Sequence, residues 1–189
     1  MVTTDREYRA FEMRIADGEM NVDGYAVVFK QPTVLYSFDG IDYKEEIDRH
    51  AFDEAEMTDV VMNYNHQGKP VARTKNGTLA LSVDDKGVRV SAGLSGTEEG
   101  RRLYEEIKGG YIDKMSFAFT VSEDSYDRET HTRKVLKVKR LYDVAAVDIP
   151  AYDATSISAR SYFSAEAEKE KTAEARARQK QKIKLMLEV

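Results

Sequence analysis

The chain has 189 residues, a length typical of one domain with a possible appendage and sufficient to bury a core without metal or disulfide staples. It contains no cysteine, which excludes disulfides and a cysteine nucleophile, and only three histidines, so we expect no metal or cofactor. The net charge of −5 does not favour specific nucleic-acid binding, and without a run of about 18 apolar residues no membrane span is expected.

Apolar and polar residues alternate over most of the first 162 residues, which predicts strands bounded by turns. Asp39-Gly40 and the stretch from Asp84 to Gly87 are typical turn sequences. The predicted strands are 8–15, 24–29, 34–38, 41–47, 60–64, 79–83, 88–92, 111–121, 135–141 and 144–149.

Two helices are expected between these strands. The first, over residues 50–57, is short. The second, over residues 97–108, has Thr97 as its cap, and Gly109-Gly110 ends it. Many strands with few helices predict a β-rich (α+β) barrel or sandwich with helices packed outside.

From Ser164 onward the chain lacks Gly and Pro and is rich in residues that favour a helix. Between residues 164 and 184 there are seven Lys or Arg residues and four Glu residues, and the apolar residues there are mostly alanine. This composition predicts a solvated charged tail, helical or disordered, rather than a core element. We therefore divide the chain into a domain over 1–162 and a tail over 163–189.

His66 follows an apolar strand and precedes Gly68, a position where a rigid scaffold can present a catalytic side chain. A solvated histidine in a turn is the simpler interpretation of that position. His50 and His131 lie in charged or polar stretches and are read more easily as solvated.

Ser116 lies in the predicted strand 111–121, and it shares one face with Ala118 and Thr120. The other face carries Met115, Phe117 and Phe119, which is a plausible core. Small neighbours leave room for a substrate backbone, but a serine on a solvent-facing strand would have the same neighbours. A serine hydroxyl needs a base to become a good nucleophile, and histidine titrates near neutrality.

Acidic residues are too numerous for composition to select a third member of a catalytic triad. Asp143 interrupts an apolar strand, where a carboxylate is costly to bury unless it is paired, for example with an imidazole. A strand-edge aspartate facing water is the alternative. Asp148 lies five residues further along, on the opposite face of an unbroken strand, and a bulge would undo this difference.

At these residues the sequence resembles the prohead proteases of tailed bacteriophages, whose fold is shared with the herpesvirus capsid protease, assemblin. The resemblance covers about residues 8–159. It is carried by five segments in the same order as in the family: 24–29, His50-Ala51-Phe52, Asn65-His66, 114–119 and 141–151.

The resemblance implies an assemblin-like β-barrel flanked by helices and a serine endopeptidase with His66, Ser116 and Asp143 as its triad. It places Asp143, rather than Asp148, at the third position, and we place the oxyanion donor at a backbone N–H near Ala151 as a hypothesis. The chain departs from the family at Lys114 and Ala118, where the family has glycines around Met-Ser-Phe, and Asp143 stands where assemblin has a second histidine.

The implied function is cleavage of capsid scaffold or capsid-protein extensions, and of the protease itself, during prohead maturation. The implied partners are the major capsid protein with its scaffolding segment and further copies of this chain, inside the immature phage capsid in the host cytoplasm. A catalytically inactive assembly or scaffold module on the same fold is the alternative.

Overall fold

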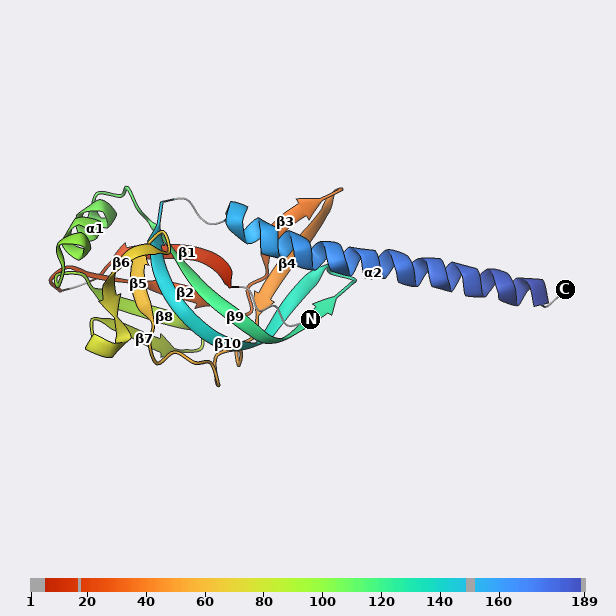
Figure 1. The fold of residues 1–189 in the computed structure, drawn as a ribbon, viewed down its shortest axis with the longest axis horizontal. Helices are drawn as coiled ribbons and strands as arrows, with labels where there is room; N and C mark the ends of the chain where they lie inside the picture. The colour runs from red at the N-terminus through yellow and green to blue at the C-terminus, as the bar shows by residue number, and fades with distance from the viewer. Residues whose placement is uncertain (1–5, 17, 149–151, 188–189) are drawn as a thin grey trace.

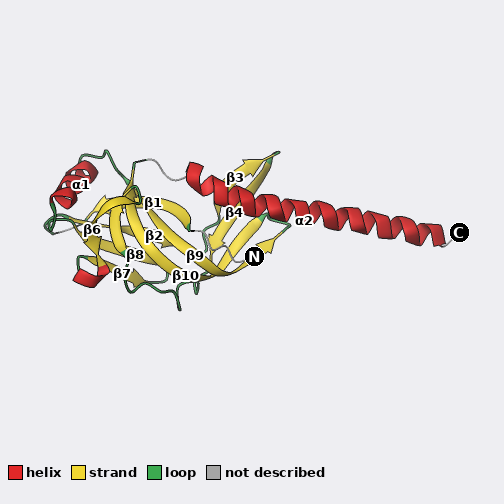
Figure 2. Cartoon of the chain, viewed as in Figure 1, coloured by secondary structure: helices red, strands yellow, loops and turns green. Residues whose placement is uncertain are grey.

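The computed structural model describes residues 6–16, 18–148 and 152–187 (Figure 1). The protein is β-rich, with one mixed ten-stranded sheet and a few helices (Figure 2). The strands are β1 (Glu7–Ile15), β2 (Asn21–Val28), β3 (Thr33–Phe38), β4 (Ile41–Ile47), β5 (Val61–Tyr64), β6 (Gln67–Arg73), β7 (Leu79–Val83), β8 (Gly87–Gly93), β9 (Lys114–Asp127) and β10 (Thr132–Val147). The helical elements are the 3-10 turn η1 (Thr74–Asn76), α1 (Glu98–Lys108) and α2 (Tyr152–Leu187).

The sheet runs in the order β3-β4-β10-β9-β1-β2-β8-β7, and the β5–β6 hairpin joins it through β5 and β10. Most pairs are antiparallel, but β10 runs parallel to both β4 and β5. Among the described residues, the end strands β3 and β7 do not pair with each other, so the sheet is open rather than a closed barrel. Figure 1 shows that β9 and β10 are long and strongly curved.

The pair β9–β10 forms the centre of the sheet. Its core face carries Met115, Phe117 and Phe119 on β9 and Leu141 and Val144 on β10, all at most 1% exposed. The predicted strands 135–141 and 144–149 are a single strand, β10, which continues through several irregularities in its pairing with β9. Ile149 lies outside the described residues.

The prediction of a helix over residues 50–57 is wrong. The segment forms successive turns, in which the N–H groups of Ala51 and Asp53 donate to the carbonyls of Asp48 and His50. The turns bury the adjacent side chains of Ala51 and Phe52, and Glu56 then forms a parallel bridge to Arg140 on β10. A regular helix would not bring the chain back to the strand in this way.

The helix expected over residues 97–108 is confirmed as α1. The Thr97 hydroxyl accepts a hydrogen bond from the Gly100 N–H at 2.9 Å, so Thr97 caps the helix as expected. Leu103 and Ile107, one turn apart, are buried against the sheet, and Gly110 has a φ of 74° just past the helix end.

A buried ionic cluster joins β1, β4, β9 and β10. Arg133 is 2% exposed and donates to Glu7 at 2.6 and 3.0 Å, to Glu45 at 3.1 Å and to Asp124 at 2.7 Å. Arg9 donates to Glu45 through two nitrogens, both at 2.6 Å. Burial alone would lower the pKa of Arg133, but Glu45 and Glu7 raise it overall, so the guanidinium stays charged.

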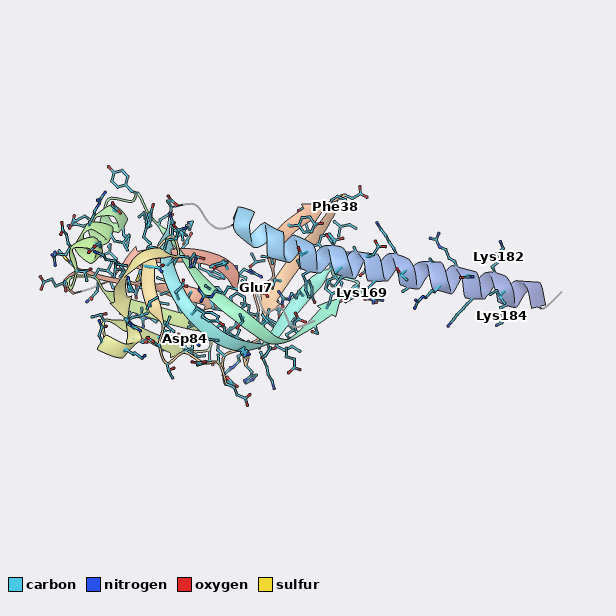
Figure 3. The ribbon with its side chains drawn as sticks, viewed as in Figure 1. Glu7, Phe38, Asp84, Lys169, Lys182 and Lys184 are labelled. Atoms are coloured by element: carbon cyan, nitrogen blue, oxygen red, sulfur yellow. The ribbon has the colours of Figure 1, made fainter. Side chains whose placement is uncertain are left out.

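The helix expected from residue 164 begins earlier, at Tyr152. Phe163 is buried with Leu35 and Tyr43 in a small cluster of its own, and Tyr162 stacks on the Arg133 guanidinium at 4.5 Å. Figure 3 shows α2 leaving the body of the protein near Lys169 and carrying Lys182 and Lys184 far from it. Neither α1 nor the described part of α2 combines the length and the apolar character that a membrane span requires.

Candidate active site

Ser116 lies on β9 between two neighbouring strands, opposite Ala10 of β1 and Ala145 of β10. Residues paired directly across a sheet share a face, so Ser116 faces the same way as Ala145 and, by alternation, Ala118. Ser116, Ala118 and Ala145 are each 0% exposed. The sequence predicted this alternation, but it did not predict that both faces of β9 are buried.

His66 lies in the two-residue loop of the β5–β6 hairpin, between the paired residues Tyr64 and Gln67. Both loop residues have positive φ angles, 49° for Asn65 and 58° for His66, as a type I′ hairpin turn requires. Glycine is favoured at the second of these positions, so a histidine there costs conformational energy. The Asn65 N–H donates to the Ala146 carbonyl at 2.9 Å and holds the loop against β10.

Asp143 reaches the Ser116 face because of a bulge in β10. Leu141 pairs with Phe119 and Asp143 pairs with Ala118, so Leu141 and Tyr142 together oppose a single residue of β9. The extra residue shifts the alternation of β10 by one position. Leu141 therefore points into the core, whereas Asp143, two residues later, points to the face of Ser116.

These three side chains meet, although they come from three different strands or turns. His66 Nε2 lies 2.8 Å from Ser116 Oγ, and His66 Nδ1 is hydrogen-bonded to Asp143 Oδ1. The His66 and Asp143 side chains are 14% and 8% exposed, so the contacts are largely shielded from water. A carboxylate that binds one imidazole nitrogen while the other nitrogen contacts a hydroxyl is the arrangement that acyl transfer uses.

Two further residues of the site were not identified from the sequence. The Tyr8 ring packs edge-on against the imidazole, with ring centroids 4.6 Å apart. Asn63 lies in the same cross-strand row as Ala145 and Ser116, and its buried Oδ1 has no hydrogen-bond partner among the described residues. Only the pairing of β1 and β5 with the central strands brings these residues to the site, and no local sequence signal marks them.

The other considered residues make different contacts. Asp148 follows the end of β10, is exposed and accepts a hydrogen bond from the Tyr64 hydroxyl at 2.9 Å, which raises the pKa of Tyr64. His50 is exposed and contacts Asp53 at 2.9 Å. His131 lies at the tip of the β9–β10 hairpin, 3.1 Å from the Tyr126 hydroxyl.

Ala151, where the oxyanion donor was expected, lies outside the described residues. Across the part of the chain that the structure describes, no group of three His, Cys, Asp or Glu side chains could hold a metal ion.

Comparison with known proteins gives a similar fold and a matching family. No curated protein matches the chain. Among solved structures, the capsid assembly protease gp21 of bacteriophage T4 is similar, with a TM-score of 0.54 and 15% identity over 77% of this chain and 98% of that one. At this identity the likeness concerns the fold.

The sequence itself matches the family described as Caudovirus prohead serine protease over residues 6–172, further toward the C-terminus than the resemblance over 8–159 suggested. The protein therefore belongs to the caudovirus prohead serine protease family.

Proposed function

We propose that the protein is a serine endopeptidase with Ser116 as nucleophile, His66 as general base and Asp143 as the residue that orients the histidine. The observation that carries this proposal is the imidazole of His66, which contacts Ser116 through one ring nitrogen and Asp143 through the other. Membership of a serine protease family supports the same reaction class.

In the proposed reaction, Ser116 Oγ attacks the scissile carbonyl carbon while His66 Nε2 takes the hydroxyl proton. Asp143 accepts a hydrogen bond from Nδ1–H, which fixes the tautomer with Nε2 unprotonated and then stabilises the imidazolium. His66 returns the proton to the leaving amine as the peptide bond breaks. A water molecule, activated by the same imidazole, then hydrolyses the acyl-enzyme ester and releases Ser116.

The Ser116 side chain has no exposed surface, so substrate binding requires residues above it to move. Small neighbours, Ala118 and Ala145, would leave space for a substrate backbone once this has happened. A chemical probe of the serine should therefore react slowly but specifically.

The proposed substrates are capsid scaffold or capsid-protein extensions and the protease itself, cleaved inside the prohead in the host cytoplasm. The major capsid protein with its scaffolding segment would be the partner. Family membership supports this role, and the similar protein of bacteriophage T4 is described as a capsid assembly protease. No membrane or specific nucleic-acid partner is proposed.

We also propose an assemblin-like organisation, in which the curved open sheet takes the place of the barrel and residues 1–162 form the protease domain. Residues 163–189 would then form a charged helical tail that targets or tethers the enzyme during assembly. The exposure of the described residues beyond 171 supports a solvated tail there, whereas the buried Phe163 shows that the start of this segment is anchored to the body.

The experiment that tests the activity is labelling with a fluorophosphonate, which reacts with activated serines. The wild type should be labelled, Ser116→Ala should not, and Ser122→Ala is a matched control because Ser122 is an exposed serine on the same strand. No labelling of the folded wild type would favour the alternative, an inactive assembly module. Labelling of Ser116→Ala equal to that of the wild type would contradict the assignment of the nucleophile.

A further inference from the structure

A charged cleft of about 640 Å³ lies over β1, β2 and β8, at the start of β9. None of its residues belongs to the site described above. Its charged lining consists of Glu12, Arg14, Asp23, Lys86, Arg89 and Lys114. The lining has four cations against two carboxylates, and with Asp113, which contacts Lys114 from outside the lining, the surplus is one positive charge, although the chain as a whole carries −5.

The cleft opens on the same face of the sheet as the nucleophile. Lys114 and Ser116 are two residues apart on β9, so their side chains point the same way. The register agrees, because Lys114 pairs with Glu12 and Ser116 pairs with Ala10 on β1. Two residues of a strand span about 6.6 Å, so the lysine lies one side-chain repeat from the serine.

One carboxylate of the cleft is fully engaged by the protein. Asp23 accepts hydrogen bonds from Arg14 and Arg89, both at 2.9 Å, and its side chain is 7% exposed. The hydrogen bond from Arg14 is the largest cause that lowers the pKa of Asp23, so the carboxylate stays ionised. This single negative charge is shared between two guanidinium groups, which leaves one positive charge uncompensated.

The two lysines are held less firmly. The Lys86 ammonium lies 4.4 Å from the centre of the Tyr25 ring. The Lys114 ammonium lies 3.4 Å from Asp113 and 3.7 Å from Glu12, whose side chains are 68% and 90% exposed. Ion pairs with such exposed partners are weak, so a carboxylate of a ligand can replace them at little cost.

We propose that this cleft is a substrate subsite that takes an Asp or Glu side chain about two residues from the scissile bond, and that Lys114 determines this specificity. The inference rests on the proposed peptidase function. An extended polypeptide places side chains on one face every 6.6–7 Å or so, the spacing between Ser116 and Lys114. An acidic side chain there fits the surplus positive charge of the cleft.

Cleavage of a mixed peptide library, with products identified by mass spectrometry, tests this preference. The wild type should favour Asp or Glu at one position within three residues of the scissile bond. Replacing that residue by Gln in a single defined peptide should lower kcat/KM by up to about fivefold, the effect of one partly shielded charge pair. Lys114→Glu should reverse the preference toward Lys at the same position.

Lys137→Glu is the matched control, since Lys137 also forms an exposed ion pair, with Glu123 at 3.5 Å, but does not line the cleft. It should keep the wild-type preference. An acidic preference that is absent from the wild type, or one that Lys114→Glu leaves unchanged, would overturn the subsite.

Binding separates failure of the subsite from failure of the peptidase function. Fluorescence anisotropy should show tighter binding of the Glu peptide than of its Gln counterpart to Ser116→Ala, and Lys114→Glu in that background should abolish the difference. If the wild type cleaves no peptide but this difference in binding is present, the peptidase function is contradicted and the subsite is supported. If cleavage occurs without any difference in binding or turnover, only the subsite is contradicted.

Discussion

Leu141 and Asp143 are two residues apart on β10, yet Leu141 is buried in the core and Asp143 contacts His66 on the opposite face. The bulge that places Leu141 and Tyr142 opposite one residue of β9 accounts for this reversal. In an unbroken strand both side chains would point the same way, and the carboxylate would be buried among apolar side chains. The bulge is therefore a requirement of the site.

Asp143→Asn should lower turnover strongly, by about 10⁴-fold if the group acts as the aspartate of known triads does, because a neutral amide neither fixes the histidine tautomer nor stabilises the imidazolium. Asp148→Asn should change turnover only modestly, since Asp148 is exposed and bonded to Tyr64. Steady-state cleavage across pH, with circular dichroism as a check of folding, compares the two. The reverse order would move the role to Asp148, and two mild effects would indicate that Ser116 and His66 act as a dyad.

Ser116→Ala and His66→Ala should each lower turnover by several orders of magnitude, and the double variant should be little worse, because the two groups act in one proton transfer. Ser116→Ala should remain folded, since alanine fits the buried position and removes only the contact with His66. Turnover measured for all three variants gives the coupling. Effects that multiply in the double variant would show that the two residues act independently.

The sequence predicted most strands because apolar and polar residues alternate along them, and it predicted α1 because Thr97 and Gly109-Gly110 mark its ends. It did not predict β6, whose first residues, Gln67 to Pro70, are all exposed and include a glycine and a proline, which are uncommon inside strands. β6 is the second strand of the hairpin whose turn contains His66. Because β6 was not predicted, neither the tight turn nor the positive φ of His66 could be predicted.

The triad could be proposed from the sequence only through resemblance, because a histidine, a serine and an aspartate occur in most proteins. Alternation placed Leu141 and Asp143 on one face, and a bulge of one residue has no reliable sequence signal. Tyr8 and Asn63 come to the site through pairings between strands that are distant in sequence. Such pairings depend on the whole sheet, which local patterns do not specify.

Arg133→Leu should lower the free energy of unfolding by about 3–5 kcal/mol, because Glu7, Glu45 and Asp124 would be left without their shared buried partner. Arg140→Leu, on the same strand, is the control. Its side chain is half exposed and lies 3.6 Å from Glu56, so the loss should be at most about 1 kcal/mol. Urea unfolding of the three proteins measures both values. Equal, small losses would mean that the cluster contributes little to stability.

Alkaline pH should weaken the attachment of α2. Burial is the largest cause that raises the pKa of both Tyr126 and Tyr162, whose rings pack around Phe163. A raised pKa in the folded state means that the stabilisation is complete below the unfolded value of about 10 and is lost progressively as the pH rises above it. Tyr162→Phe should reduce this loss. Spectrophotometric tyrosine titration beside thermal melts measures it, and identical alkaline melts for both proteins would contradict the assignment.

The effect of truncating α2 on the melting temperature should depend on whether the cut removes the part of the helix that contacts the body. A chain that ends after Ala173 keeps Phe163 and the contact between Arg128 and Glu170, so its melting temperature should be nearly unchanged. A chain that ends before Tyr162 loses both Phe163 and the Tyr162 ring that stacks on Arg133, so its melting temperature should be clearly lower.

Phe163→Ala in the full chain isolates the anchor and should cost about 3–5 kcal/mol, as for other large buried side chains. If the chain that ends before Tyr162 were as stable as the full chain, or if removal of residues 174–189 lowered stability as much as Phe163→Ala, the division between anchor and tail would be wrong. With stability unchanged, the chain that ends after Ala173 can be tested for incorporation into proheads, where a loss would assign the targeting role to the exposed part of the helix.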